Sequence, residues 1–534
     1  MTRKTVGEAL VAGLKARGVS CVFGIPGVHT VELYRGLAAS GIRHVTPRHE
    51  QGAGFMADGY ARVSGQPGVA FVITGPGLTN TLTPMAQARA DSVPMLVVSG
   101  VNASGTLGKG HGHLHELPDQ HALAKTVALI SAHVAQPEEL EAALDRAFAP
   151  FSAGRPGPTH VQIPLDVAGT TSQNGPEVSV PAQPPLDPAQ ISVAAGRLSA
   201  ASKVVILGGG GAKGAGRDLQ ALSERLDAPV VQTVNARGLM HGHPLTVPAS
   251  PSLRAVRALI GDADCVLALG TELGPTDYDM YATGSMPAMA GLIRVDICQD
   301  QLARRETELA IHSRAEDAIS ALLAALPAHQ KHSRGAARAE HTRAAAFEEI
   351  GADYRAQVEV LNAMRAAVPN ALMVGDSTQP IYAGNLYYDH DRPGGWFNAA
   401  TGYGALGYGI PAAIGAAIAA PDTPVICIAG DGGAQFSLPE IMAAVDENLP
   451  ITFMIWNNRG YGEIANSMQD VGVPVVGCDP TPPEFGPVAA SFGIPYSRVP
   501  MEPQAVAAAL RETSKSGTPS ILEIDITGPA PDQE

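Results

Sequence analysis

Asp431 and Asn458 are the pair of residues whose spacing points most directly to chemistry. Asp431 lies in a Gly-Asp-Gly triplet, and Asn458 follows 27 residues later in the stretch Trp456-Asn-Asn-Arg-Gly460. Each comes directly after a strand-like apolar run, 425–429 or 451–456, with a helical stretch between the runs. Because neighbouring parallel strands present their carboxyl ends at one edge of a sheet, we expect the two side chains to lie close together. Mg²⁺ prefers oxygen ligands shared with phosphates, so the pattern predicts a metal and diphosphate site formed by Asp431, Asn458 and Gly460.

The two glycines after Asp431 fit the same interpretation. Gly432 and Gly433 have no side chain, so phosphate oxygens could approach the backbone closely. We expect a helix to begin near Ser437 with its N-terminus directed at the phosphates. The alternative is an ordinary turn aspartate and an ordinary loop asparagine. The triplet alone would not decide between them, but its combination with the second motif favours the diphosphate site.

The elements that must position these residues are those of a multidomain α/β protein. A chain of 534 residues is expected to form about three domains. Its hydrophobic content of 45%, with few aromatic residues, suits parallel sheets buried under helices. A linker rich in Pro and polar residues at 170–188 and a second boundary near 328–337 divide the chain. We therefore predict three doubly wound parallel-sheet domains, at 1–170, 186–328 and 346–534.

Charge, hydropathy and cysteine content exclude several classes of partner. The formal net charge of −15 argues against a nucleic-acid partner, which would need a basic patch. No apolar run approaches the ~20 residues of a membrane-spanning helix, and the first residues lack the apolar core of a signal peptide. The five cysteines are scattered, which predicts buried thiols and no disulfide or zinc framework. We expect a cytoplasmic protein that binds neither nucleic acid nor membrane.

Four further stretches resemble a known family. They are Phe23-Gly-Ile-Pro-Gly27, residues 48–62 beginning Arg-His-Glu-Gln-Gly, Thr74-Gly-Pro-Gly-Leu-Thr-Asn80, and residues 154–164 beginning Gly-Arg-Pro-Gly-Pro. With the two motifs above, they resemble in order the thiamine diphosphate-dependent 2-oxo acid decarboxylases and acetohydroxyacid synthases, over nearly the whole chain. The resemblance implies the thiamine diphosphate-binding fold. Its N-terminal domain would bind the pyrimidine ring, and its C-terminal domain would bind the diphosphate and Mg²⁺, with an α/β domain between them.

The resemblance also assigns roles around the cofactor. Glu50 would bond to the aminopyrimidine ring and so promote loss of the thiazolium proton. We expect Glu50 to be buried in apolar surroundings, which residues 52–55 permit. Leu406 would support the bent cofactor from beneath, and the Gly404 carbonyl would accept the pyrimidine amino group. The alternatives are a surface carboxylate and an ordinary core leucine. The other cofactor contacts that the resemblance implies are Ser377, Thr378, Gly432 and Gly433.

A histidine-rich loop at 110–119 bears on the fate of the intermediate that decarboxylation leaves. Protonation of this intermediate gives an aldehyde, whereas its attack on a second carbonyl gives a hydroxyketone. Histidine titrates near neutrality and suits protonation. The loop aligns with a histidine pair of pyruvate-type decarboxylases, which makes His113 and His115 candidate acids. His29 is a third candidate, because Val28 stands where related decarboxylases carry an acid or a serine. The alternatives are a metal site or a solvated loop, and helix capping for His29.

Glu463 lies just beyond the predicted metal loop, where acetohydroxyacid synthases carry a Met-Val pair. A carboxylate there would either manage protons or pair with a cationic substrate tail; a surface salt bridge is the alternative. Taken as a whole, the sequence resembles the bacterial decarboxylases of 5-guanidino-2-oxopentanoate, whose guanidinium would be matched by Glu463, Glu116 or Asp119. The alternative functions are an acetolactate synthase-like carboligase that joins two 2-oxo acids and a catalytically silent homologue.

Flavin and assembly are two further points on which the family is informative. Some members hold FAD in the central domain, but residues 270–279 depart from their Arg- and Asp-rich sequence, which argues against FAD here. In the family, the pyrimidine domain of one subunit meets the diphosphate domain of another. We therefore expect a homodimer or homotetramer in which Glu50 and Asp431 of one active site come from different chains.

Overall fold

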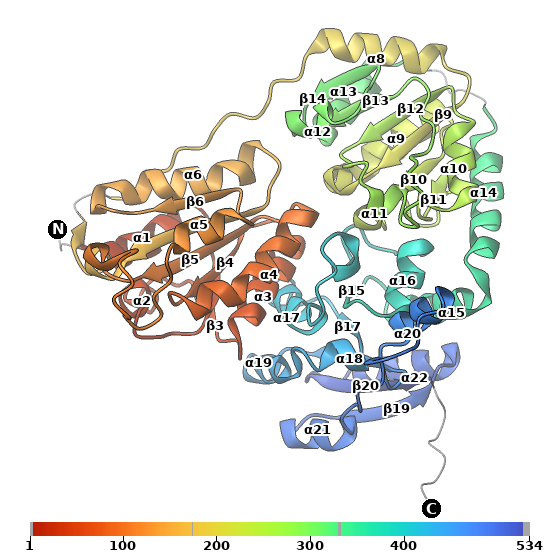
Figure 1. The fold of residues 1–534 in the computed structure, drawn as a ribbon. Helices are drawn as coiled ribbons and strands as arrows, with labels where there is room; N and C mark the ends of the chain where they lie inside the picture. The colour runs from red at the N-terminus through yellow and green to blue at the C-terminus, as the bar shows by residue number, and fades with distance from the viewer. Residues whose placement is uncertain (1–3, 173–174, 329–332, 527–534) are drawn as a thin grey trace, which may run out of the picture.

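The computed structural model describes residues 4–172, 175–328 and 333–526. These residues form three units, each built on a six-stranded parallel sheet (Figure 1). In Figure 1 the N-terminal unit runs from red to orange, the central unit from yellow to green, and the C-terminal unit from cyan to blue.

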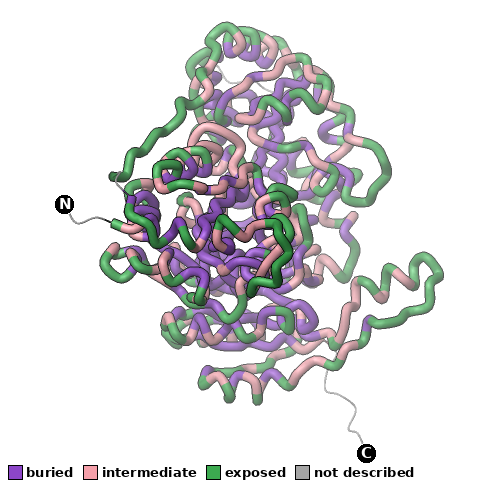
Figure 2. Tube along the Cα trace, turned by 60° about the vertical axis from the view of Figure 1, so that its left-hand side comes forward, coloured by how far each residue is buried: buried purple, intermediate pink, exposed green. Residues whose placement is uncertain are grey.

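Each sheet is covered by helices on both faces. In the N-terminal unit, Val69 and Phe71 pack into one hydrophobic core, whereas Ala70 and Val72 of the same strand pack into another on the opposite face. The other two sheets alternate in the same way. Figure 2 shows the buried segments in the interior of the molecule and the exposed segments around them. The predicted fold class, three doubly wound α/β units, is confirmed.

The N-terminal unit has the strand order β3-β2-β4-β5-β7-β6, with a short antiparallel pair, β1 and β8, beside it. The helix that begins at Glu50 ends at Gly65, whose φ of 69° is the left-handed conformation that stops a helix. The strands are β1 (Lys4–Thr5), β2 (Cys21–Gly24), β3 (Arg43–Val45), β4 (Gly68–Val72), β5 (Met95–Val101), β6 (Ile130–His133), β7 (Pro158–Pro164) and β8 (Thr171–Ser172). The helices are α1 (Val6–Ala16), α2 (Val31–Tyr34), α3 (Glu50–Ser64), α4 (Pro76–Asp91), α5 (Gln120–Lys125), α6 (Leu140–Ala153) and α7 (Leu165–Ala168).

The central unit has the order β11-β10-β9-β12-β13-β14, which is the arrangement of dinucleotide-binding α/β sheets. The strands are β9 (Val204–Gly208), β10 (Val230–Gln232), β11 (Thr246–Val247), β12 (Cys265–Leu269), β13 (Ile293–Asp296) and β14 (Leu309–His312). The helices are α8 (Pro188–Ala200), α9 (Gly216–Leu226), α10 (Arg254–Gly261), α11 (Pro275–Tyr278), α12 (Gln299–Ala303), α13 (Ala315–Ala325) and α14 (Gly335–Glu349).

The C-terminal unit has the order β16-β15-β17-β18-β20-β19. Counted from each unit's own first strand in the main sheet, this is the order of the N-terminal unit, so the two outer units share one topology. The strands are β15 (Leu372–Gly375), β16 (Trp396–Asn398), β17 (Val425–Gly430), β18 (Ile451–Asn457), β19 (Tyr496–Pro500) and β20 (Ser520–Asp525). The helices are α15 (Gly351–Ala367), α16 (Gln379–Leu386), α17 (Gly409–Ala419), α18 (Asp431–Ala434), α19 (Ile441–Asp446), α20 (Gly462–Asp470), α21 (Phe485–Phe492) and α22 (Pro503–Thr513).

Helices α3 and α17 join the two outer units in one continuous hydrophobic core. Their backbones touch, because a Cβ on Gly59 of α3 would collide with the carbonyl oxygen of Ala412 of α17. A Cβ on Gly415 would likewise collide with the carbonyl oxygen of Met56. Glycine at these positions therefore sets how closely the helices approach.

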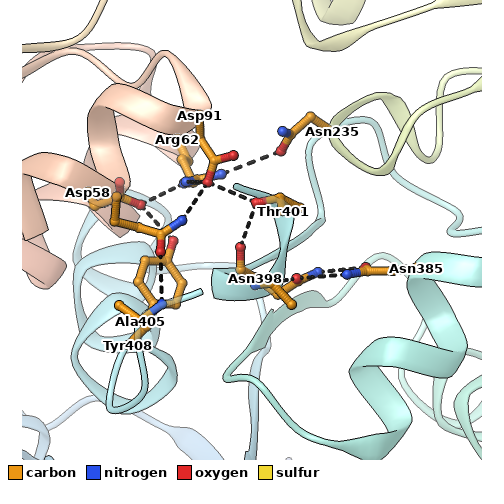
Figure 3. Close-up of polar contacts among 11 residues, drawn as sticks. Asp58, Arg62, Asp91, Asn235, Asn385, Asn398, Thr401, Ala405 and Tyr408 are labelled. Atoms are coloured by element: carbon orange, nitrogen blue, oxygen red, sulfur yellow. Dashed lines mark hydrogen bonds and ion pairs between the residues drawn. The ribbon is translucent and has the colours of Figure 1, made fainter. Parts of the chain in front are cut away.

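A buried ion cluster connects all three units (Figure 3). Arg62 of α3 donates to Asp58 and to Asp91, both at 2.6 Å, and to Asn235 of the central unit at 3.4 Å. From the C-terminal unit, Tyr408 donates to Asp58 at 2.6 Å. The side chains of Arg62, Asp58 and Asp91 are at most 2% exposed.

The segments between the units differ in structure. Residues 175–187 form neither helix nor strand and run from the N-terminal to the central unit (Figure 1). Helix α14 occupies much of the interval from 328 to 346 between the predicted domains, and its Ala339 and Ala346 pack on the central unit. The domain limits drawn from sequence stay predictions. Among the helices described, none has the length and apolar character needed to cross a membrane.

Candidate functional site

Asp431 and Asn458 lie side by side at the carboxyl edge of the C-terminal sheet. Strand β17 ends at Gly430 and pairs with β18, placing Gly430 opposite Trp456. The backbone N–H of Asn458 donates to Asp431 Oδ1 at 3.3 Å. The side-chain oxygen of Asn458 accepts the N–H of Gly460 at 3.2 Å. The three predicted metal ligands thus come from two adjacent strand ends.

Asp431 has an oxygen suited to a cation. Its Oδ2 is buried and has no hydrogen-bond partner among the residues that the structure describes. Burial raises the pKa of Asp431, although backbone N–H groups, including that of Asn458, act in the opposite direction. A buried carboxylate oxygen without a partner is costly unless a cation ligates it. Asp431, Asn458 and Gly460 therefore fit Mg²⁺.

Gly432 and Gly433 allow other side chains to pack closely against the backbone beside this carboxylate. A Cβ on Gly432 would lie 2.5 Å from the ring of Tyr461, and one on Gly433 would lie 3.2 Å from Asp376 Oδ1. Helix α18 begins at Asp431 itself, and Ser437 precedes a 3₁₀ turn, Leu438–Glu440, that continues directly into α19. A helical segment thus begins near Ser437 as predicted, and the direction of its N-terminus toward the phosphates stays a prediction.

A cavity of about 430 Å³ opens over these residues. Its volume falls in the range of cofactor and substrate sites. Asp431 and Glu463 are the only charged side chains among its described lining residues. No residue of the N-terminal unit contributes to that lining. The predicted site residues that line it are Ser377, Thr378, Gly404, Leu406, Asp431, Gly432, Gly433, Asn458, Gly460 and Glu463.

Glu463 is held by two residues that the sequence motifs did not indicate. Its Oε1 accepts from Gln379 Nε2 at 2.9 Å, and its Oε2 accepts from the Tyr354 hydroxyl at 3.2 Å. Gln379 also contacts Asn458, so it bridges the metal loop and Glu463. Gln379 directly follows the Gly375–Thr378 stretch. Its position beside this motif is the one feature of the local sequence from which a role in the site could have been predicted. Tyr354 lies on α15 and has no such signal.

Glu50 is the first residue of α3 and is half-buried. Its Oε2 accepts from Asn80 Nδ2 at 3.0 Å. The expectation of a buried, apolar environment was wrong for the single chain. The small residues that follow Glu50 face other elements: a Cβ on Gly52 would meet Glu440, and one on Gly54 would meet Pro84. Asn80, the last residue of the 74–80 motif, is a further site residue that we did not assign from sequence.

His29 and His115 form a pair at the carboxyl edge of the N-terminal sheet, with ring centroids 5.1 Å apart. His29 is 8% exposed, and its Nδ1 has no hydrogen-bond partner among the described residues. Burial, with a smaller contribution from His115, lowers the pKa of His29. His115 Nδ1 lies 3.3 Å from the Thr74 carbonyl oxygen and can donate to it. His113 is exposed, and its ring lies 6.0 Å from that of His111, centroid to centroid, in a tilted arrangement.

The carboxylates of the histidine-rich loop hold the backbone. Glu116 accepts the N–H groups of Gly110, Gly112 and His113 at 2.7–3.0 Å. Asp119 accepts the N–H of Ala122 at 2.8 Å and so caps α5. In the part of the chain that the structure describes, no group of three His, Cys, Asp or Glu side chains is placed to bind a metal ion. The metal alternative for this loop therefore has no support.

Family comparisons agree with this geometry. Residues 4–123 match the N-terminal TPP binding domain of thiamine pyrophosphate enzymes, residues 191–322 match their central domain, and residues 374–524 match their C-terminal TPP binding domain. The chain belongs to the thiamine pyrophosphate enzymes. The family resemblance inferred from the sequence motifs is confirmed.

Individual thiamine pyrophosphate enzymes are similar over most of their length. A probable 2-ketoarginine decarboxylase of Pseudomonas aeruginosa is 44% identical over 92% of this chain and 88% of its own. The large subunit of acetolactate synthase isozyme 1 of Escherichia coli is 30% identical over 98% of this chain and 95% of its own. A sulfoacetaldehyde acetyltransferase of Castellaniella defragrans is 32% identical over 86% and 82%. The similarity therefore includes decarboxylases and carboligating or acyl-transferring members of the thiamine pyrophosphate enzymes.

The central domain of this thiamine pyrophosphate enzyme borders a second cavity, of about 590 Å³. Its walls include Gly210, Thr271 and Asp296, which follow or end β9, β12 and β13. This is the sheet edge at which dinucleotide-binding units hold ligands. The expectation that FAD is absent concerns this unit and stays a prediction.

Proposed function

We propose that the protein is a thiamine diphosphate- and Mg²⁺-dependent decarboxylase that converts 5-guanidino-2-oxopentanoate to an aldehyde and CO₂. This compound is 2-ketoarginine, the substrate in the name of the relative that is 44% identical. The position of Glu463 is the observation that supports this choice of substrate. It is a carboxylate in the wall of the same cavity as Asp431, and no Lys, Arg or His side chain lines that cavity among the residues described.

Glu463 is suited to a guanidinium group. Each of its oxygens accepts one hydrogen bond, from Gln379 or Tyr354, and keeps a lone pair for a further donor. A planar guanidinium can bond to both oxygens of one carboxylate at once. Glu116 and Asp119, the other acids considered from sequence, are bonded to backbone N–H groups. Glu463 is therefore the carboxylate we assign to the substrate tail.

The protein's own residues hold and move protons around the cofactor. When bound, thiamine diphosphate supplies a carbon nucleophile and an electron sink for decarboxylation. Glu50 would share a proton with a nitrogen of the pyrimidine ring, and Asn80 would keep the carboxylate in place. Asp431, Asn458 and Gly460 would bind the Mg²⁺ that neutralises the diphosphate. His29 and His115, with His113 nearby in sequence, would deliver the proton that forms the aldehyde.

We also propose that the active unit is a homodimer or a homotetramer of such dimers. The cavity of the C-terminal unit lacks a wall from the N-terminal unit among its described lining residues, and Glu50 is not part of it. Apolar side chains are exposed near both halves of the site: Val28 and Leu114 on one, Tyr403 and Ile464 on the other. A second copy that covers both faces would bring Glu50 of one chain to Asp431 of the other.

Product analysis tests the reaction. The protein would be incubated with thiamine diphosphate and Mg²⁺ and given 5-guanidino-2-oxopentanoate or pyruvate. We expect 4-guanidinobutanal and CO₂ from the guanidino acid. Acetolactate from pyruvate would instead establish the carboligase suggested by the acetolactate synthase relatives. Failure with both would favour a silent homologue, against which the presence of Glu50, Asp431 and Asn458 argues.

A matched variant tests the substrate assignment. Glu463→Gln should raise KM for the guanidino acid about 10–100-fold, because a charged hydrogen bond to carboxylate is worth roughly 1.5–3 kcal/mol. The KM for 2-oxohexanoate, which has no charge on its tail, should change little. An equal loss with both substrates would instead indicate that Glu463 manages protons.

We further propose a cytoplasmic location and the absence of FAD. The five cysteines are scattered along the chain and four of them are buried, a pattern of use typical of a reducing compartment. The absorbance spectrum of the purified protein tests the flavin point, since bound FAD would give a yellow protein.

A further inference from the structure

Gln87 of α4 is fully buried and bonds to the loop that carries Gly404 and Leu406. Its side-chain oxygen accepts the backbone N–H of Ala405 at 3.3 Å. That N–H belongs to the same peptide unit as the Gly404 carbonyl. A trans peptide is planar, and its N–H and C=O point in opposite directions. The bond to Gln87 therefore fixes the direction of the Gly404 carbonyl, which faces away from Gln87.

Gly404 makes this restraint necessary. Its φ is 75°, a conformation that favours glycine, and the space where a Cβ would stand is open to 4 Å. Without a Cβ, the adjoining peptide meets little steric resistance to rotation. Gly404 also lines the cavity of the candidate active site, so a rotation would redirect a carbonyl in that wall. The hydrogen bond from Ala405 opposes the rotation.

Gln87 is held in turn by Asp91, a member of the buried ion cluster that Figure 3 shows. Gln87 Nε2 donates to Asp91 Oδ2 at 2.8 Å. The same oxygen accepts from Arg62 at 2.6 Å and from the Thr401 hydroxyl at 2.8 Å. Buried ion pairs contribute little net stability, because desolvation offsets their attraction. This cluster instead provides a fixed position for Gln87 and for the start of the loop.

We propose that Gln87 is a positioning residue, which aims the Gly404 carbonyl at the amino group of the cofactor's pyrimidine ring by holding the Ala405 N–H. The inference rests on the proposed cofactor, thiamine diphosphate, and on the role that the family resemblance gives Gly404, namely that the pyrimidine ring binds beside it. It adds a residue from the N-terminal unit of the same chain to the machinery that orients the cofactor.

Two variants separate this role from general stabilisation. Gln87→Leu removes the acceptor of the Ala405 N–H, whereas Thr401→Val removes a hydrogen bond to the same Asp91 oxygen and leaves Ala405 bonded. The readout is binding, with Mg²⁺ present, of thiamine diphosphate and of 4′-deaminothiamine diphosphate, which lacks the amino group. One ordinary hydrogen bond predicts about a tenfold preference for thiamine diphosphate in the wild type. We expect it to fall below about twofold in Gln87→Leu and to persist in Thr401→Val.

Each other outcome decides against part of the scheme. A Gln87→Leu protein that keeps the full preference overturns the inference, and so does an equal loss in both variants, which would mark the cluster as structural. A wild type without any preference overturns both the inference and the role of Gly404. A wild type that shows the preference but decarboxylates no 2-oxo acid overturns the proposed activity alone. If Gln87→Leu does not fold, Gln87→Met, which is unbranched and offers only a weak thioether acceptor, replaces it.

Discussion

Asp431 is a buried carboxylate with one oxygen left free by the described residues, and this makes its metal role testable. Asp431→Asn should weaken the apparent affinity for Mg²⁺ by more than the roughly 10–100-fold that loss of a residue supporting a metal ligand costs. The measurement is the Mg²⁺ concentration that raises the thermal unfolding midpoint with thiamine diphosphate present. Asp422→Asn, a change at an exposed carboxylate of the same unit, is the control. Equal Mg²⁺ dependence in both variants would contradict the assignment.

Substitutions of Glu50 and Asn80 should differ in how far they lower kcat. Glu50→Gln removes the proton-sharing group and should lower kcat by about 10²–10⁴-fold. Asn80→Ala leaves the carboxylate but removes its hydrogen bond, so about a tenfold loss is expected. Steady-state kinetics at saturating cofactor measures both, with the exposed Glu138→Gln as a control. A larger loss for Asn80→Ala than for Glu50→Gln would reverse the roles.

The sequence predicted those site residues that follow strand ends in recognisable motifs. Asp431 and Asn458 could be paired because each comes directly after an apolar run in adjacent strands. Tyr354 could not be found in this way, since it meets Glu463 across 109 residues and lies on a helix with no special pattern. Gln87 bonds to Ala405 across 318 residues. Such contacts depend on how complete units pack together, which local patterns do not determine.

At the scale of elements, the crossing of α3 and α17 depends on glycine. Gly59→Ala would place a Cβ against the backbone of α17 and should destabilise the protein by about 1–3 kcal/mol. Gly196→Ala is the matched control, because this helical glycine of α8 has open space around it and should be neutral or slightly stabilising. Urea unfolding midpoints of the two variants provide the comparison. A stable Gly59→Ala protein would show that the helices can separate at little cost.

The long apolar strands were predictable as elements, whereas short helices were not. The strand-like runs at 425–429 and 451–456 correspond to β17 and β18, because continuous Val and Ile runs suit buried parallel strands. The helical segment expected near Ser437 begins there, at Leu438, whereas the short helix α18 at Asp431–Ala434 was not expected. The position of α14 follows from its packing on the central unit, which no local signal in 328–346 indicates.

The stability of the whole molecule should depend on pH through His160. Its two ring nitrogens each lie 2.8 Å from a serine hydroxyl, and burial lowers its pKa from 6.5 to about 3. Between these pH values the unfolded chain binds more protons than the folded one, so stability rises with pH. Relative to His160→Gln, the wild type should lose up to about 2 kcal/mol between pH 7.5 and pH 5. Urea unfolding at both pH values tests this, and a parallel response of the two proteins would contradict it.

The shared strand order of the two outer units gives each of them a carboxyl edge with half of the site, and the proposed dimer joins these halves across chains. Mixing two inactive variants tests that arrangement. In a mixed dimer of Glu50→Gln and Asp431→Asn chains, one site carries both changes and the other carries neither. Co-expression in equal amounts should therefore restore about a quarter of wild-type activity, because half of the dimers are mixed and each has one intact site of two. If both residues of a site came from one chain, every site would carry one change and activity would stay at the level of the separate variants.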